Sequence, residues 1–347
     1  MVTMADVAAR AGVSVSTVSH VLNETRPVSE VLVARVREAV EATGYSMNAV
    51  ARSLATSRTR LIGMVVSATS DIFFGRLITT MEEAARRHGY SVLISDTQDD
   101  AQLEVAQVRL MLDQQVSGLI LSPVNSRPGP ALDLAWRRRV PTALVDRFAD
   151  DRFDQVGAEN VDATAGLVDH VAALGHQRIG FIAGRSGPTT TDERLDGYRL
   201  GLERNGLRVD RRLVRAGGSR ADRARAATRR LFELRQPPTA LVSGNDEMTV
   251  GVLRALRELG RRVPDDVAVV SYDDTAHGDL LEPPLTALAQ PIPAIGRAAV
   301  EMLVARMKDP TLPPQHRRMA PVLVHRRSCG CPAEARPVDG PQLAAVT

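Results

Sequence analysis

A run of small and apolar residues near the N-terminus, MADVAARAGVSVSTVSHVLN at positions 4–23, has the spacing of two short helices. Thr3 precedes it and Asp6 follows three residues later, which is the pattern of a capping box at a helix start. Gly12 is suited to end that helix, and Ser14 is placed to cap a second one. Two short helices joined by a tight turn that contains glycine form a helix-turn-helix.

A third helix is predicted from Ser29, its expected N-cap, to Gly44, its expected C-terminal stop. Its apolar residues recur at helical spacing and form one inner face: Leu32, Val33, Val36, Ala39 and Val40. Tyr45 can fold back on the last of these. We therefore expect residues 1–46 to form a small all-α helix-turn-helix domain.

The second helix of a helix-turn-helix enters the major groove of DNA, and residues near its N-terminus meet base edges. Val15, Ser16 and His20 occupy such positions here. Serine bonds to several bases, valine contacts a thymine methyl, and histidine donates to a guanine acceptor. Spacing alone leaves open that these are ordinary solvated helix positions, since residues 1–60 hold seven arginines against five acids.

The run from Met4 to Asn23 closely resembles the DNA-binding domain of the lactose-repressor (LacI/GalR) family. The resemblance implies a homodimeric transcription repressor that binds double-stranded DNA at a near-palindromic operator. It implies that Val15, Ser16 and His20 set base preference. It further implies phosphate contacts from five residues: Thr3, Ser14, Thr17, Ser19 and Asn23.

A short linker at residues 47–60 follows. Residues 48–56 could form a helix of about two turns, which is marginal alone in water. The tetrapeptide ARSL at 51–54 resembles the family's hinge helix, which orders when two copies meet on the minor groove. This implies DNA contacts from Arg52 and from Leu54, the latter as an apolar wedge between base steps. Leu54 could instead pack on the following domain.

From residue 61 onward, short apolar runs alternate with amphipathic helices, which predicts a doubly wound parallel α/β fold. Ile62-Gly63 and Gly89-Tyr90-Ser91-Val92 recur 117 positions later as Ile179-Gly180 and Gly206-Leu207-Arg208-Val209, which indicates a duplicated βαβ unit. We expect a two-lobed domain at 61–335 and a flexible tail at 336–347. The N-lobe would comprise about 61–160 and 292–320, and the C-lobe about 161–290 and 321–335.

Two lobes of this kind place ligand groups at the carboxyl ends of their strands. Taken singly, a polar residue after a strand is usually a turn former or a helix cap. The stretches 174–184, 194–198 and 264–274 resemble the same family and the periplasmic sugar-binding proteins that share its fold. The resemblance implies a periplasmic-binding-protein-like domain whose effector, a sugar or sugar derivative, contacts eight residues: Asp71, Phe73, Phe74, Asp146, Arg194, Asn245, Asp273 and Gln290.

Some of these residues have competing interpretations. Phe73 and Phe74 could be plain core residues, and we expect Asp246 and Asp274 to be structural. The pattern Asp71-Ile72 departs from the asparagine-proline common in the family and adds a charge to the predicted pocket wall.

Several function classes are excluded or disfavoured. Lys308 is the only lysine, so no phosphate-binding GxxxxGK[ST] loop exists, and HExxH and GxSxG are absent. We expect no enzyme activity, no cofactor and no metal. Cys329 and Cys331 have only His325 nearby in sequence, so we expect reduced thiols of minor structural importance.

No apolar run of about 18 residues is present, and the N-terminus lacks the order of a signal peptide, so we expect a cytoplasmic protein without a membrane segment. Two rival functions remain. A solute-binding protein would fit the two-lobed domain but would leave residues 1–60 unexplained. A nucleotide-dependent enzyme would use the glycines of 180–187, whose spacing is not GxGxxG.

Overall fold

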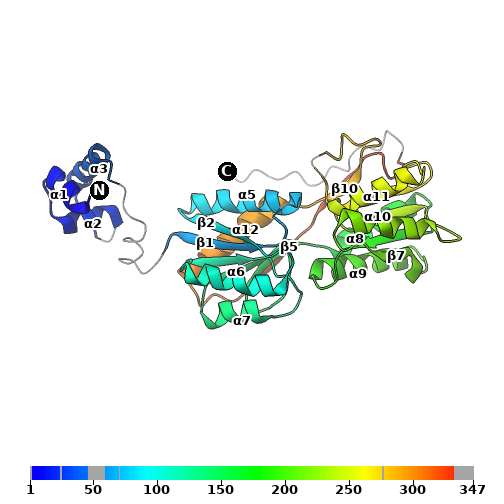
Figure 1. Cartoon of the computed structure of the whole chain (residues 1–347), viewed down its shortest axis with the longest axis horizontal. Coiled ribbons are helices and arrows are strands. Elements are labelled where there is room, and N and C mark those ends of the chain that lie inside the picture. The colour runs from blue at the N-terminus through cyan, green and yellow to red at the C-terminus, as the bar shows by residue number, and fades with distance from the viewer. Residues whose placement is uncertain (1, 24–25, 46–58, 70, 276, 332–347) are drawn as a thin grey trace. The chain divides into compact units, whose positions relative to one another are not determined.

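The computed structural model describes residues 2–23, 26–45, 59–69, 71–275 and 277–331. The chain divides into two compact units, of which the first holds Met1–Arg60 together with the short segment Gln115–Ser117. The second holds the remainder and is the two-lobed part of Figure 1. The predicted hinge contacts Arg52 and Leu54, and the predicted tail at 336–347, lie outside the described residues.

The N-terminal unit contains three helices: α1 (Met4–Ala11), α2 (Val15–Asn23) and α3 (Glu30–Thr43). The predicted capping box is confirmed, because the Thr3 side chain accepts from the Asp6 amide while the Asp6 carboxylate accepts from the Thr3 amide at 2.8 Å. Gly12 ends α1 with φ 62°, in the left-handed region that glycine adopts without strain. Ser14 caps α2 by accepting from the Thr17 amide at 3.1 Å.

The core of this unit is small and apolar. Its buried members are Val7, Ala8, Ala11, Val18, Val36 and Ala39. The predicted end of α3 is confirmed, since Gly44 has φ 63° and the Tyr45 amide donates to Val40 O at 3.2 Å. The prediction that the Ser29 side chain caps α3 is wrong, because it makes no such bond. Its backbone carbonyl alone accepts from the first turn, at 3.0 Å from the Leu32 amide.

The first lobe is built on a fully parallel sheet with strand order β11-β5-β4-β3-β1-β2. Its strands are β1 (Leu61–Val66), β2 (Ser91–Asp96), β3 (Gly118–Leu121), β4 (Thr142–Val145), β5 (Asp154–Ala158) and β11 (His316–Met319). Its helices are α5 (Ile72–Arg87), α6 (Ala101–Asp113), α7 (Pro130–Arg137) and α12 (Ile292–Lys308). β1, β3 and β4 are almost entirely buried, as continuous apolar runs in a sheet covered on both faces should be.

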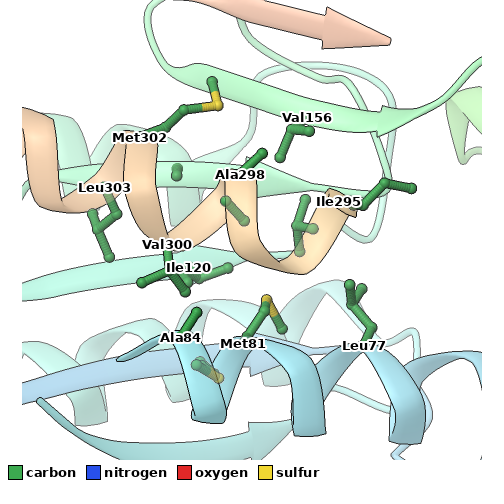
Figure 2. Packing of buried hydrophobic residues seen from close by; sticks show 14 of the residues in the cluster. Leu77, Met81, Ala84, Ile120, Val156, Ile295, Ala298, Val300, Met302 and Leu303 are labelled. Carbon is green, nitrogen blue, oxygen red and sulfur yellow. The ribbon is translucent and has the colours of Figure 1, made fainter. Parts of the chain in front are cut away.

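Helices α5 and α12 pack together on one face of this sheet, and α6 and α7 lie on the other (Figure 1). Figure 2 shows the resulting core, in which Leu77 and Met81 of α5 face Ile295 and Leu303 of α12. Ile120 of β3 completes the contact from the sheet. A helix from near the C-terminus is therefore integral to the lobe formed by the earlier part of the domain.

The second lobe repeats this plan with strand order β12-β10-β9-β8-β6-β7, in which only the β10–β12 pair is antiparallel. Its strands are β6 (Ile179–Ala183), β7 (Val214–Ala216), β8 (Ala240–Ser243), β9 (Ala268–Tyr272), β10 (Thr286–Ala289) and β12 (Val322–Val324). Its helices are α8 (Val161–Ala173), α9 (Thr189–Arg204), α10 (Ala221–Phe232) and α11 (Asp246–Glu258), with a 3-10 turn η1 at Arg211–Leu213. The predicted architecture, a small helical unit plus a two-lobed doubly wound unit, is confirmed.

The internal repeat is visible in the helices, since α5 and α9 both start and both end 117 positions apart. The repeat would place a strand directly after Gly206, as β2 follows Gly89 in the first copy, but β7 begins only at Val214. Asp210 accepts from the Arg212 amide and starts a 3-10 turn first. Val209 is 49% exposed, so it does not belong to a buried strand at this place.

The chain passes between the lobes three times: after β5, after β10 and between β11 and β12. β11 pairs with β5 in the first sheet, whereas β12 pairs with β10 in the second. Among the described residues, no helix has both the length and the apolar character that a membrane crossing demands.

Candidate functional site

A cavity of about 90 Å³ lies between the two lobes. All eight residues predicted for the effector site line it: Asp71, Phe73, Phe74, Asp146, Arg194, Asn245, Asp273 and Gln290. They come from the ends of strands in both sheets and from the helices that follow them. A larger groove, of about 850 Å³ beside α11, contains none of the eight.

Two aspartates occupy equivalent places in the two lobes. Asp146 directly follows β4 and Asp273 directly follows β9, and each of these strands is third in the common strand order of its sheet. Both residues have positive φ, 69° and 78°, which is uncommon outside glycine and is tolerated best by asparagine and aspartate. Strained backbone of this kind concentrates at functional sites, where the surrounding structure holds it.

Arg194 of α9 is held rigidly at the cavity wall. Its Nε donates to Asn160 Oδ1 at 2.9 Å and its Nη1 donates to Gly244 O at 2.6 Å. Its guanidinium carbon lies 3.6 Å from the centre of the Tyr272 ring, and Nη1 is 3.8 Å from Asp273 Oδ2. A buried cation fixed by an aromatic face, two acceptors and a carboxylate is preorganised to bind an oxygen of a ligand.

A second arginine performs a similar role in the first lobe. Arg147 Nη1 donates to Asp99 Oδ1 at 2.7 Å and to Ser67 Oγ at 3.0 Å, while Nε lies 3.5 Å from Asp146 Oδ2. Burial opposes ionisation of Asp99, but Arg147 and Arg185 outweigh it and lower the pKa of this carboxyl. Asp99 is therefore a stable anion that anchors Arg147.

Gln290 follows β10, at the point where the chain leaves the second sheet. Its amide nitrogen donates to Asp273 Oδ1. Its carbonyl oxygen is buried and has no hydrogen-bond partner within the described part of the chain. A buried acceptor without a donor costs free energy, and a ligand hydroxyl in the cavity would relieve that cost.

Burial disfavours the anionic form of the other three carboxyl groups that line the cavity. Burial raises the pKa of Asp146 to about 6, against the opposing effect of Arg147 and Arg194. Burial also raises the pKa of Asp71, and the charge of Asp273 raises it further. The pKa of Asp273 is itself raised by burial, although Arg194 lowers it in part. Such perturbed carboxyls in a cavity favour a binding site.

Phe73 and Phe74 line the cavity and also belong to the core of the first lobe, as the alternative interpretation predicts. Their rings meet edge to face with centroids 5.3 Å apart. The predicted structural role of Asp274 fits its ion pair with Arg326, at 2.6 Å. Asp246 does not line this cavity, and its carboxylate accepts from the Glu247 amide at 2.7 Å.

Several lining residues were missed. Thr190 and Thr191 face the cavity and stand 117 positions after Phe73 and Phe74, so the internal repeat carried the signal that could have found them. Asp99 also lines the cavity. It lies in the loop after β2 with φ 57°, and no sequence pattern distinguishes it from a turn former.

The N-terminal part of α2 is accessible in its own unit. Val15 is 46% exposed, and Ser14 and Ser16 are exposed beside it. The Ser14 hydroxyl lies 2.7 Å from Ser16 Oγ and 2.8 Å from Thr17 Oγ1, so the three hydroxyl groups form one polar cluster at the helix start. The structure does not describe the side chain of Asn23. Exposed hydroxyls around a helix N-terminus suit contact with phosphate and with base edges.

Comparison with known proteins assigns the family. The model for bacterial regulatory proteins of the lacI family matches residues 3–48, and a periplasmic binding protein-like domain matches residues 168–329. The ribose operon repressor of Escherichia coli (strain K12) is 35% identical over 330 residues, which cover 94% of this chain and 100% of that protein. The chain belongs to the LacI family of bacterial regulatory proteins. The HTH-type transcriptional repressor PurR of Vibrio atlanticus (strain LGP32) is 32% identical, covering 94% of this chain and 98% of that protein.

Solved structures agree with this assignment. The lac repressor dimer bound to operator and the anti-inducer ONPF superposes with a TM-score of 0.84 at 30% identity, covering 94% of this chain and 99% of that one. The complex of the transcriptional regulator CelR with cellobiose superposes with a TM-score of 0.73 at 29% identity, covering 94% and 100%. This LacI-family member is therefore a DNA-binding transcriptional regulator and not an enzyme.

Proposed function

We propose that this regulator is a cytoplasmic homodimeric repressor that binds a near-palindromic operator and releases or grips it in response to a sugar-like effector. The relatives named above include a ribose operon repressor, and one structural neighbour is a complex with cellobiose. The observation that carries the proposal is the convergence of all eight predicted effector residues on one cavity between the lobes.

The charge of the cavity supports an uncharged polyhydroxylated effector. Its lining has four carboxyl groups, Asp71, Asp99, Asp146 and Asp273, against two guanidinium groups, Arg147 and Arg194. Carboxylates accept hydrogen bonds from hydroxyl groups, whereas they repel phosphate. The flat rings of Phe73 and Phe74 suit the apolar face of a sugar ring. We therefore expect free sugars to bind better than their phosphate esters.

Thermal-shift screening of the full-length protein with sugars, sugar phosphates and polyols tests this, with ribose in the first set. A binding sugar should raise the melting temperature in a concentration-dependent manner. Asp273→Asn should weaken that sugar at least about tenfold, because it removes a charged acceptor from the cavity wall. Asp196→Asn on the exposed face of α9 is the matched control. A sugar phosphate that binds more tightly than its free sugar would contradict the charge argument.

For operator binding, we propose that Val15, Ser16 and His20 contact bases. Thr3, Ser14, Thr17, Ser19 and Asn23 would contact phosphates, and Arg52 and Leu54 would act at the central minor groove. The exposed hydroxyl cluster at the start of α2 supports this assignment. Ser16→Ala should weaken the free energy of binding to the best operator by about 1–3 kcal/mol. It should also relax base preference at one position of each half-site. Ser29→Ala is the matched control, because its side chain makes no capping bond.

Selection of operators from a random duplex pool, followed by anisotropy titrations against bulk competitor DNA, measures both effects. A plain solute-binding protein would show no sequence preference. Equal losses for Ser16→Ala and Ser29→Ala would exclude a base contact by Ser16.

We propose a two-state switch as the mechanism. Arg185 of the second lobe donates to Asp99 Oδ1 at 3.1 Å and to Val124 O at 2.7 Å in the first lobe. The Phe148 amide donates across the same gap to Thr189 Oγ1 at 3.0 Å. An effector that binds both lobes would favour one spacing between them. A coupling free energy of about 1–3 kcal/mol would change operator affinity roughly 5- to 150-fold.

A further inference from the structure

Four potential metal ligands meet at one place in the second lobe, away from the effector cavity. His170 lies in the last turn of α8, and His325, Cys329 and Cys331 lie in the segment after β12. Their ligand atoms all lie within 4.8 Å of one another. In the sequence only His325 is near the cysteines, but the fold also brings His170 to them, from 155 positions before His325.

The separations among His170, His325 and Cys331 are close to those of a tetrahedral metal centre. Zn–N bonds of about 2.05 Å and Zn–S bonds of about 2.3 Å imply N–N, N–S and S–S separations of about 3.3, 3.6 and 3.8 Å. His170 Nε2 lies 3.0 Å from His325 Nε2. Cys331 Sγ lies 3.5 Å from the Nε2 atoms of both histidines. The two sulfur atoms are 3.2 Å apart, closer than that ideal but far beyond a disulfide bond of about 2.05 Å.

The backbone and the surroundings support a site for a cation. Gly330, between the cysteines, has φ 86°, which turns both thiols toward the same point. Thr286 Oγ1 donates to Cys329 Sγ at 3.2 Å, as an outer-shell hydroxyl does to a ligating thiolate. Cys329 is buried and free, and Cys331 is half-buried and free. Hydrogen bonds between these side chains would pair them two at a time. A cation at the centre would instead bind a lone pair from each of the two histidines and two cysteines at once.

We propose that His170, His325, Cys329 and Cys331 bind one Zn²⁺ ion in a closed tetrahedral site. Two imidazoles and two thiolates are a ligand set typical of zinc, and the two thiolate charges balance the ion. Four protein ligands leave no position for a substrate, so the site is structural. It joins the C-terminal end of α8 to the segment after β12. β12 pairs with β10, and Gln290 directly follows β10.

The test uses full-length protein without a polyhistidine tag, purified under reducing conditions. Elemental analysis should find about one zinc per chain, as the closed site predicts. After removal of zinc by a chelator, Co²⁺ should give the intense visible bands of tetrahedral cobalt and a thiolate-to-cobalt charge-transfer band. Added Zn²⁺ should abolish both and raise the melting temperature of the stripped protein.

Cys331→Ser and His170→Asn should each weaken Zn²⁺ binding at least about tenfold. His176→Asn is the matched control, because this histidine follows α8 nearby and its Nδ1 faces Thr239 rather than the cluster. Sub-stoichiometric zinc that added Zn²⁺ does not restore, an octahedral cobalt spectrum, or a Cys329–Cys331 disulfide in the absence of metal would each overturn the proposal. If a variant does not fold, the wild-type stoichiometry and cobalt spectrum decide.

Discussion

Replacing Asp146 by asparagine should stabilise the ligand-free regulator, and increasingly so as the pH rises. Burial raises the pKa of Asp146 from 3.8 to about 6, with Arg147 and Arg194 only partly offsetting it. A carboxyl whose pKa is higher in the folded state stabilises the fold while it is protonated. That contribution is fully present below about pH 3.8 and is lost as the pH rises through about 6.

The magnitude follows from the two pKa values. The difference between 3.8 and about 6 corresponds to about 3 kcal/mol of unfolding free energy at alkaline pH. Proton linkage assigns about 1.6 kcal/mol of this loss to pH values up to about 5 and about 1.4 kcal/mol to the range from about pH 5 to 8. Asp146→Asn lacks this titration, so its stability relative to wild type should increase by about 1.4 kcal/mol over that range.

Urea unfolding of the ligand-free full-length chain at both pH values measures this difference. Trp136, the only tryptophan, lies on α7 in the same lobe as Asp146 and reports on its unfolding. Asp151→Asn removes a highly exposed carboxylate nearby and controls for the loss of one charge. A relative stability of Asp146→Asn that stays constant or falls from pH 5 to 8 would refute the burial argument.

Three further substitutions test the packing of the lobes and one of their ion pairs. Gly197→Ala should lower the free energy of unfolding by at least about 1–3 kcal/mol, because a Cβ there would lie 2.2 Å from Val161 O. Gly166→Ala, in open space on α8, should raise it by about 0.5–1 kcal/mol. Thermal unfolding compares the two, and equal effects would deny a close approach of α8 and α9. Arg306→Ala should cost about 3–5 kcal/mol, because it leaves Asp154, with its side chain 3% exposed, as an unpaired buried carboxylate. A loss below about 1 kcal/mol in urea unfolding would mean that this pair behaves like a surface salt bridge.

Local signals in the sequence predicted most of the fold. The capping box of Thr3 and Asp6 involves residues three positions apart, and buried strands such as β3 and β4 appear as continuous apolar runs. Caps fail as predictors where the backbone alone completes the turn, as at Ser29. The sequence predicts β7 too early, because Asp210 starts a 3-10 turn that hydrophobicity does not reveal.

The sequence predicts those residues of the candidate site that directly follow a strand, because the end of the strand places their side chains beside the cavity. Asp146 and Asp273 follow the carboxyl ends of equivalent strands in the two sheets. The strand pattern and the family resemblance therefore both point to them. Asp99 lies in an irregular loop, and only the folded structure places it beside Arg147. His170 meets Cys331 through tertiary structure alone, which no spacing in the sequence encodes.

The duplication itself explains why a ligand in this cavity can act as a switch. Because the two sheets share one strand order, Asp146 and Asp273 end equivalent strands and converge on one cavity from opposite lobes. A ligand bonded to both carboxylates has an affinity that depends on the distance between the lobes. The ligand therefore binds one lobe spacing more tightly than another, and only such a difference in affinity lets a ligand shift a conformational equilibrium. The same ligand held by one lobe alone would bind but would not bias the spacing, so coupling requires that both halves of the duplication keep their acidic residue.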